Sequence, residues 1–246
     1  FNNATTAEQR EAAMKVALAT ALSSPQFLYR QETGIAAADI RAGNAQAVLP
    51  AQAIDDDAYI LTPYELASFL AFTFTGSTPD VELLTAAQEN RLASDAQIEA
   101  QVDRLLRKPS ARAHCGKFAE RWLGLDEVVK GTARGLSFIN MPAGVNQPLL
   151  QEVREVFNHV VLDDAGPFNT LLASDYSIIS KRLFNFYGLG NAYVDNENFS
   201  KTVYPAQTRQ GGLLTSGAFV VSVSGFSETD PRAAALAIRN RILCQD

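Results

Sequence analysis

Histidine and carboxylate side chains along one stretch of predicted helix are the residues most suited to chemistry in this chain. Glu152, Glu155 and His159 recur at intervals of three and four residues, which places them along one side of a helix. Carboxylates and an imidazole at this spacing can ligate a metal ion inside a helical bundle. However, this side of the helix, with Glu152, Glu155 and His159, lies opposite the apolar stripe, where a solvated Glu155–His159 pair is the expected arrangement. The sequence leaves these interpretations open, and His159 is also a candidate for cofactor contact.

The second histidine, His114, directly precedes Cys115, and the other cysteine is Cys244. Adjacent helical side chains point about 100° apart, so His114 and Cys115 are not expected to act as base and nucleophile. Either histidine could still ligate a haem from a neighbouring segment. Cys115 and Cys244 could form one disulfide, as would suit an exported protein, or remain two buried thiols. Two cysteines alone build neither a c-type haem attachment nor a zinc site.

A glycine pair near the C-terminal third offers a further candidate site. Arg209 and the backbone of Gly211 and Gly212 could hold an anion, and Arg209 is therefore a second candidate for cofactor contact. The segment lacks the GxGxxG and GxxxxGK(S/T) patterns of nucleotide-binding loops, so we favour a tight turn that lets backbones pack closely. The serines that follow form no GxSxG elbow, and a serine hydrolase has no support.

Composition indicates a globular protein and argues against two kinds of partner. Of the 246 residues, 47% are hydrophobic and 20% are charged, and the net charge is −6. A negatively charged chain is poorly suited to nucleic acid, which is bound through clustered Lys and Arg. The densest basic run, Arg104 to Arg112, contains Pro109 and is interpreted as a solvated helix junction. No apolar run approaches the roughly 20 residues that cross a bilayer, so no membrane span is expected.

Start signals for short helices recur along the whole chain. A capping residue followed by proline predicts four helix starts, at Ser24-Pro25, Thr62-Pro63, Thr78-Pro79 and Asp230-Pro231. Capping boxes are predicted at three helix starts. At the first start either Thr5 or Thr6 is the cap, with Glu8 and Gln9 able to reach back; the other two are Thr62 with Glu65 and Ser94 with Gln97. The strongest amphipathic stripe is formed by Leu149, Val153, Val156, Phe157 and Val160.

Towards the C-terminus the pattern predicts helices over 168–172, over 178–187 before Gly188, and from Pro231 onwards. A short strand is predicted near 202–204, and residues 213–223 suit a strand or a buried helix. The expected fold is mostly α, an irregular bundle of about eight to ten short helices with long loops. We expect N-terminal helices and a linker over 1–60, a helical module over 61–130, and a second module over 131–246 packing on the same core.

Five segments, in order along nearly the whole chain, resemble the signatures of a bacterial protein family. They are LSSPQFLYRQE from Leu22, LTPYELASFLAFTFTGSTPDVELL from Leu61, FAERWLGLD from Phe118, LLASDYSIISKRLFNFYGL from Leu171, and RQGGLLTSGAFVVSVSGFSETDP from Arg209. The family consists of exported helical domains of unknown function that are abundant in planctomycetes and associated with cytochrome c. In that family a proline-rich stretch and a CxxCH segment commonly follow the last helix, and this chain contains no CxxCH. Glu152 lies near the position of a glutamate that recurs in the family, and the resemblance therefore implies a partly buried structural group as an alternative for this residue.

The resemblance implies export to the periplasm or the cell surface and a haem c in an adjacent segment or partner, with no cofactor in this chain. Our leading hypothesis is a non-catalytic structural and docking module that supports electron transfer by that haem domain. Its partner would be a c-type cytochrome domain or another exported protein, contacted near the loops over 188–209. The alternative is an oxidoreductase domain whose active site forms with the adjacent haem segment. We also expect this chain to be part of a longer polypeptide.

Overall fold

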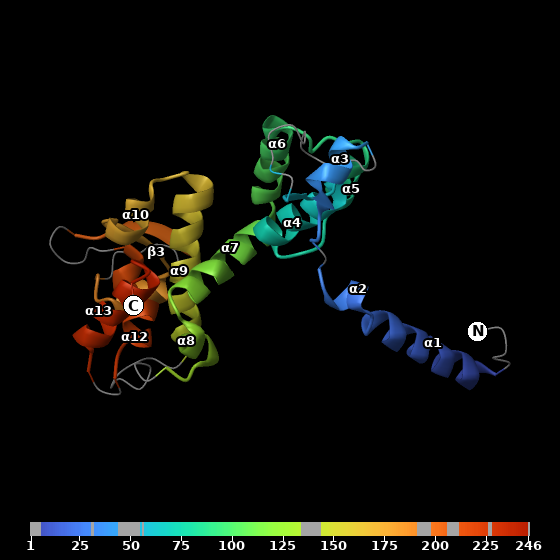
Figure 1. The fold of residues 1–246 in the computed structure, drawn as a ribbon. Coiled ribbons are helices and arrows are strands. Elements are labelled where there is room, and N and C mark those ends of the chain that lie inside the picture. The colour runs from blue at the N-terminus through green and yellow to red at the C-terminus, as the bar shows by residue number, and fades with distance from the viewer. Residues whose placement is uncertain are drawn as a thin grey trace. The chain divides into compact units, whose positions relative to one another are not determined.

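The computed structural model describes residues 6–30, 32–43, 55, 57–133, 144–190, 198–205, 212–225 and 228–245 (Figure 1). Helices dominate these residues, and the strands among them form two small two-stranded sheets. The predicted mostly α class with long loops is therefore confirmed. The chain divides into an N-terminal unit, residues 1–73 and 78–101, and a C-terminal unit, residues 74–77 and 102–246. The predicted module boundaries after residues 60 and 130 remain predictions.

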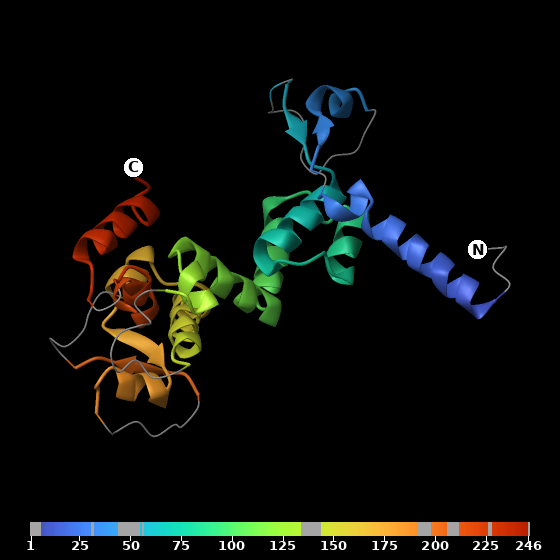
Figure 2. The ribbon, with the colours of Figure 1, turned by 90° about the horizontal axis from the view of Figure 1, so that it is seen from below.

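The N-terminal unit combines short helices with one small sheet. Its elements are α1 (Ala7–Leu22), α2 (Pro25–Leu28), β1 (Ile35–Ala36), α3 (Ala37–Arg41), β2 (Tyr59–Ile60), α4 (Pro63–Thr75), α5 (Val81–Gln88) and the first part of α6 (Asp95–Leu106). Strands β1 and β2 pair antiparallel, and Ile60 packs against Ala37 of α3 in a small core of their own. Figure 2 shows α3 and this sheet side by side.

Capping residues decide where several of these helices begin. The boxes predicted at Thr6 and Thr62 are confirmed; at the second, Thr62 Oγ1 accepts from the Glu65 N–H at 3.2 Å and Glu65 Oε2 accepts from the Thr62 N–H at 2.8 Å. The predicted start at Thr78-Pro79 is wrong, because α5 begins one residue after Asp80. The Asp80 carboxylate accepts from the Leu83 N–H at 2.9 Å and is the true cap.

The C-terminal unit surrounds one long amphipathic helix. Its elements are α7 (Pro109–Trp122), α8 (Asp126–Lys130), α9 (Asn146–Asn158), the π-helical turn η3 (His159–Asp163), α10 (Phe168–Ala173), β3 (Tyr176–Ile179), α11 (Lys181–Phe186), β4 (Ser200–Val203), the 3-10 turn η4 (Gly212–Thr215), α12 (Gly217–Ser222) and α13 (Pro231–Arg241). In Figure 2, α13 and the β3–β4 pair occupy opposite ends of this unit.

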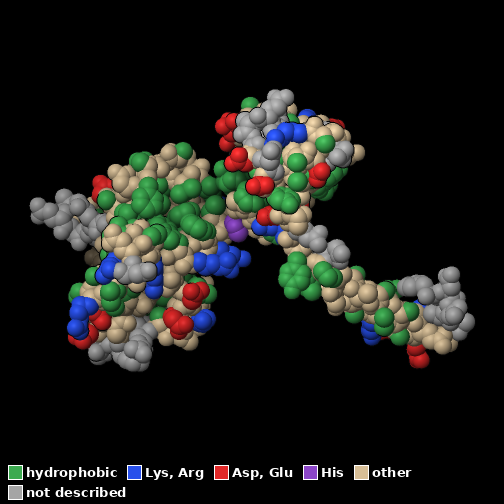
Figure 3. Space-filling view, viewed as in Figure 1, with side chains coloured by type: hydrophobic (Ala, Val, Ile, Leu, Met, Phe, Trp, Pro, Cys, Tyr) green, Lys and Arg blue, Asp and Glu red, His purple; other side chains and the backbone are tan. Residues whose placement is uncertain are grey.

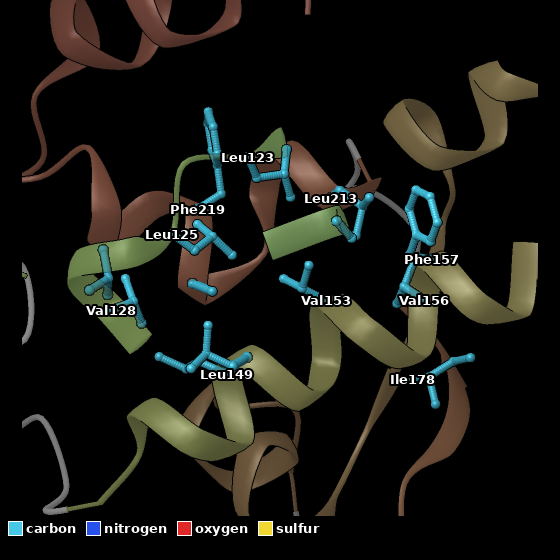
Figure 4. Close-up of a cluster of buried hydrophobic side chains, with 14 of the residues drawn as sticks. Leu123, Leu125, Val128, Leu149, Val153, Val156, Phe157, Ile178, Leu213 and Phe219 are labelled. Carbon is cyan, nitrogen blue, oxygen red and sulfur yellow. The ribbon is translucent and has the colours of Figure 1, made fainter. Parts of the chain in front are cut away.

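Helix α9 organises the core of the C-terminal unit. Figure 4 shows its apolar stripe facing side chains from α8, η4 and α12. The five predicted stripe residues are all buried, together with Leu123, Leu125, Val128, Leu213 and Phe219. Helix α7 packs closely on α9 because Gly116 leaves room for the stem of Arg154, whose guanidinium pairs with Glu120 at 2.5 Å. The core thus joins segments on both sides of residue 130.

The C-terminal elements differ in part from the predicted ones. The predicted helix over 178–187 begins too early, because Ile178 and Ile179 belong to β3, which is buried along its length and pairs with β4. Helix α11 follows, and Gly188 ends it at φ +67°, where the Leu189 N–H bonds back to the Phe184 carbonyl. The strand predicted near 202–204 is confirmed as β4, and residues 213–222 form helical turns on either side of the capping residue Ser216.

Gly212, the described member of the glycine pair, has the positive φ and the close backbone contact expected of a tight turn. It has φ +52°, and a Cβ atom there would collide with the backbone carbonyl of Leu171 at the edge of α10. Only glycine satisfies both conditions, so this position brings η4 directly against α10. Arg209 and Gly211 lie outside the described residues.

Candidate functional site

A change of helix type places the main group of ionisable side chains. At His159 the α-helix α9 widens into the π-helical turn η3, in which the Asp164 N–H bonds to the His159 carbonyl at 2.9 Å. The turn closes at Ala165, whose φ of +46° is uncommon for a residue other than glycine. Such π-helical turns are often found at functional sites, since the wider turn re-aims the side chains it carries. Here it presents His159, Asp163 and Asp164 together.

The imidazole of His159 lies between opposite charges. Its Nε2 atom is 3.1 Å from Asp164 Oδ2 and 3.3 Å from Lys201 Nζ, and its Nδ1 atom is 3.7 Å from Asp163 Oδ2. The ring also meets the edge of Tyr176, with 5.8 Å between the ring centroids. The Lys201 ammonium lies 4.0 Å from the centroid of the Tyr176 ring, a cation–π contact. Strand β4 is therefore tied to η3 through one lysine and one histidine.

Arg112 of α7 holds two of the acidic groups in place. Its guanidinium donates to both carboxylate oxygens of Asp163, at 2.8 and 3.1 Å, and to Glu155 at 3.3 Å. These hydrogen bonds lower the pKa of the Asp163 carboxyl below its usual value, against the opposing effect of burial. Asp163 and Glu155 are thus held mainly by Arg112, and Asp164 is the carboxylate that faces Nε2 of His159.

The phenol of Tyr176 is kept neutral by its surroundings. Burial raises the pKa of the Tyr176 hydroxyl, and the negative charges of Asp164 and Asp175 raise it further. The side chain therefore acts as an aromatic wall beneath Lys201 and beside His159.

A cavity of about 630 Å³ lies next to η3. Its polar lining comes from Asp103, Arg107, Lys108, Arg112 and Asp163, and its apolar lining includes Leu106, Pro109, Val161, Leu162 and Ala165. The basic run interpreted from the sequence as a solvated junction therefore borders a hollow at the start of α7. Cationic and anionic groups line it together.

Glu152 lies in the core and not on a solvated face, so its predicted place opposite the stripe is wrong. Only 1% of its surface is exposed. Its carboxylate accepts from Ser177 Oγ at 2.7 Å and from the Tyr187 hydroxyl, which in turn accepts from the Gly217 N–H at 2.9 Å. The alternative prediction, a buried structural group, is the one that the structure supports.

The three metal-ligand candidates are separated from one another. Glu152 faces Ser177 and Tyr187, Glu155 is bound by Arg112 and by Gln151 Nε2 at 2.6 Å, and His159 turns towards Asp164. Among the described residues there is no group of three or more His, Cys, Asp or Glu side chains that could hold a metal ion. The geometry therefore favours ion pairs and structural hydrogen bonds for these residues.

The remaining candidates lie apart from this group or outside the described residues. His114 packs against Gly76, where a Cβ atom would collide with its ring. Cys115 is partly buried and Cys244 is exposed, and both are free thiols here. Burial raises the pKa of the Cys115 thiol, which lowers its reactivity. The disulfide stays a prediction, as does the proposed cofactor contact of Arg209, which lies outside the described residues.

Sequence reasoning missed the partners that define this site. Arg112 meets Asp163 across 51 residues, Lys201 meets His159 across 42, and Tyr187 meets Glu152 across 35. No spacing rule connects residues so far apart. For Glu152 a signal was present, because it follows Leu149 by three residues and precedes Val156 by four, the spacing of neighbours on one helix face.

Aromatic side chains also gather on the surface of the C-terminal unit. We define the aromatic patch as Phe118 and Trp122 of α7 and Phe168 of α10. Phe118 is 55% exposed and Phe168 is 57% exposed. The Trp122 ring joins them, with centroid distances of 6.4 Å to Phe118 and 5.9 Å to Phe168. Figure 3 shows hydrophobic side chains collected over the region of α7, α9 and α10.

Comparison with known proteins gives a family but no activity. A family model matches residues 61–189, more than half of the chain, and its family is described as PSD4, protein of unknown function (DUF1592). Neither the curated proteins nor the solved structures gave a match. Within the described part of the chain, no helix combines the length and the apolar character needed to cross a lipid bilayer.

Proposed function

The chain belongs to the DUF1592 family of proteins of unknown function, and we propose that it is a non-catalytic docking module of an exported, cytochrome c-linked protein. In this role it supports electron transfer by a haem domain outside the chain and works in the periplasm or at the cell surface. The resemblance drawn from the five sequence segments supports the cytochrome partner and the location. The aromatic patch supports the docking role and moves the proposed contact to α7 and α10, since residues 191–197 and 206–209 of the loops predicted to carry it lie outside the described residues.

The aromatic patch is the observation on which this proposal depends. Phe118 and Phe168 each leave more than half of their surface in water. Covering them would gain on the order of 1 kcal/mol for each ring through apolar burial. Aromatic side chains grouped in this way are typical of the centres of protein–protein interfaces. Trp122 gives the patch a rigid middle, because its indole N–H is held by the Arg241 carbonyl at 2.9 Å.

Charged side chains border the patch along α7. Lys117 and Arg121 are exposed and precede Phe118 and Trp122 by one residue each, which places both cations on the same flank of the helix. At the rim of an interface such charges guide association and set orientation more than they add affinity. Acidic groups around the haem edge of a cytochrome would complement them.

The only tryptophan of the chain lies inside the patch, which makes the proposal directly testable. A haem group quenches nearby tryptophan emission by energy transfer, so titration with purified c-type cytochromes of the same organism should give saturable quenching of Trp122. Replacing both flanking rings, F118A with F168A, should weaken binding about tenfold or more. The matched control is V203A, since Val203 is 63% exposed but belongs to β4.

Two results would contradict the docking role. Quenching that is linear and unsaturated with every cytochrome would indicate collisions without a complex. Equal dissociation constants for the wild type and the double Phe variant, both folded by circular dichroism, would show that the patch takes no part.

The oxidoreductase alternative makes a different prediction for the same preparations. It requires a residue of this chain to contact the haem, and His159 and Arg209 are the candidates. In the complete polypeptide, H159Q and R209Q would then change the haem spectrum or the reduction potential. An unchanged spectrum and potential in both variants would remove this alternative, while the docking role predicts that both stay unchanged.

A further inference from the structure

The Nε2 atom of His159 faces two groups that it cannot satisfy at once. A neutral imidazole with its lone pair on Nε2 accepts a hydrogen bond from Lys201 Nζ, which lies 3.3 Å away. A protonated imidazole has N–H groups on both nitrogens, and Nε2 then donates to Asp164 Oδ2 at 3.1 Å while repelling the ammonium. We propose that His159 is a proton-dependent latch, holding Lys201 of β4 when neutral and Asp164 of the π-helical turn when charged.

The charges around the imidazole allow both states. Its own helix and turn carry Glu155, Asp163 and Asp164. Helix α7 contributes Arg112, strand β3 contributes Tyr176 with Asp175 just before it, and β4 contributes Lys201. Arg112 already bonds to Glu155 and Asp163, which offsets part of their charge. At Nε2 the choice therefore falls between one carboxylate and one ammonium. Imidazole is the side chain that changes charge between about pH 5 and 8.

Release of Lys201 would act on the sheet that carries it. Residue 201 pairs with Ile178 in the antiparallel register, and its ammonium reaches diagonally across to the Tyr176 ring. A two-stranded sheet is only marginally stable without further support. Among the described residues β4 pairs with β3 alone, so the Lys201–His159 contact is part of that support. Protonation of His159 removes the Lys201–His159 contact, and Lys201 then keeps only its cation–π contact with Tyr176 among these supports.

The chain is well suited to testing the latch, because it contains only two histidines. The imidazole signals can be followed by NMR across a pH titration, with His114 as an internal reference. The signal that is missing from the H159Q spectrum is assigned to His159. K201M should raise the midpoint of His159 and D164N should lower it, each by at least about half to one pH unit, the size expected for unit charges 3 to 4 Å apart when they are screened as in bulk water. The control K117M removes an exposed cation of α7 and should leave the midpoint unchanged.

A second measurement asks whether the strand responds. Amide hydrogen-exchange protection factors in β4 should fall when the pH is lowered from about 7.5 to about 5, with the midpoint of His159, and this fall should be absent in H159Q. The latch is overturned if K201M leaves the His159 midpoint where it was, or if β4 loses protection equally in H159Q. If a variant folds poorly, the wild-type protein provides the test. The latch requires its Lys201 side-chain signals to shift with the same pH midpoint as His159.

Discussion

The buried hydrogen-bond chain at Glu152 gives the sharpest test of how the C-terminal unit is held together. Replacing Tyr187 with Phe keeps the ring and removes only the hydroxyl. That hydroxyl donates to the Glu152 carboxylate and accepts from the Gly217 N–H at 2.9 Å. Glu152 is 1% exposed, so water cannot replace the lost donor without opening the core. Gly217 is equally constrained, because a Cβ atom there would lie 2.7 Å from the Tyr187 hydroxyl oxygen.

The expected loss follows from these two contacts. A hydrogen bond to a charged group contributes about 1.5–3 kcal/mol, and a buried N–H left without an acceptor costs about 1–3 kcal/mol. Since part of each term is recovered by local adjustment, we expect Tyr187→Phe to lower the free energy of unfolding of the C-terminal unit by roughly 3 kcal/mol. With a urea dependence of about 2 kcal/mol per molar, the unfolding midpoint should fall by about 1.5 M.

Trp122 fluorescence reports on the unit concerned, since the only tryptophan of the chain belongs to it. Urea unfolding followed by this signal should therefore show the shift, whereas Tyr64→Phe, which removes a hydroxyl from a residue 53% exposed, should not. The reasoning is refuted if both variants unfold at the same urea concentration. The network would then contribute no net stability, and its polar groups would be neutral relative to apolar packing.

Three further predictions concern single positions. Gly212→Ala should destabilise by about 3 kcal/mol or more in urea unfolding because a backbone carbonyl blocks its Cβ, whereas Gly144→Ala, at φ +71° with open space around it, should cost only about 1–2 kcal/mol. Burial acts to raise the pKa of Glu65, but hydrogen bonds from Thr62, Gly34 and Thr33 outweigh it and lower the pKa below 4.5. The stabilisation is thus complete above that value and lost as pH falls through the folded pKa. Glu65→Gln should therefore reduce the dependence of the urea midpoint on pH below about 4.5. If the two cysteines are free, Ellman's reagent should modify exposed Cys244 quickly and Cys115, whose pKa is raised by burial, slowly; no reaction under denaturing, non-reducing conditions would establish the disulfide instead.

Local rules predicted the parts of the fold that depend on neighbours in sequence. The stripe from Leu149 to Val160 is buried as its spacing requires, and the capping boxes at Thr6 and Thr62 form because each involves residues three apart. The helix end at Gly188 follows from the same kind of local preference for positive φ.

Features that depend on distant partners were not predictable in this way. Ile178 and Ile179 fit a helical stripe, but β4 supplies strand partners more than twenty residues later, and pairing prevails over local pattern. Glu152 was placed opposite the apolar stripe because it shares a helix side with Glu155 and His159. Its partners, Ser177 and Tyr187, come from β3 and from the end of α11, which no periodicity brings to α9.

The segment matched by the family model and the two structural units have different boundaries. The matched segment, 61–189, contains parts of both units. It includes Glu152, Ser177 and Tyr187, three members of the buried hydrogen-bond network. Yet the Gly217 N–H that completes their network, and Leu213 and Phe219 of the same core, come from residues beyond the match. Strand β4, which carries Lys201 to His159, also lies beyond it. The matched segment is therefore a recurring piece of sequence that reaches a complete core only together with the elements that follow it.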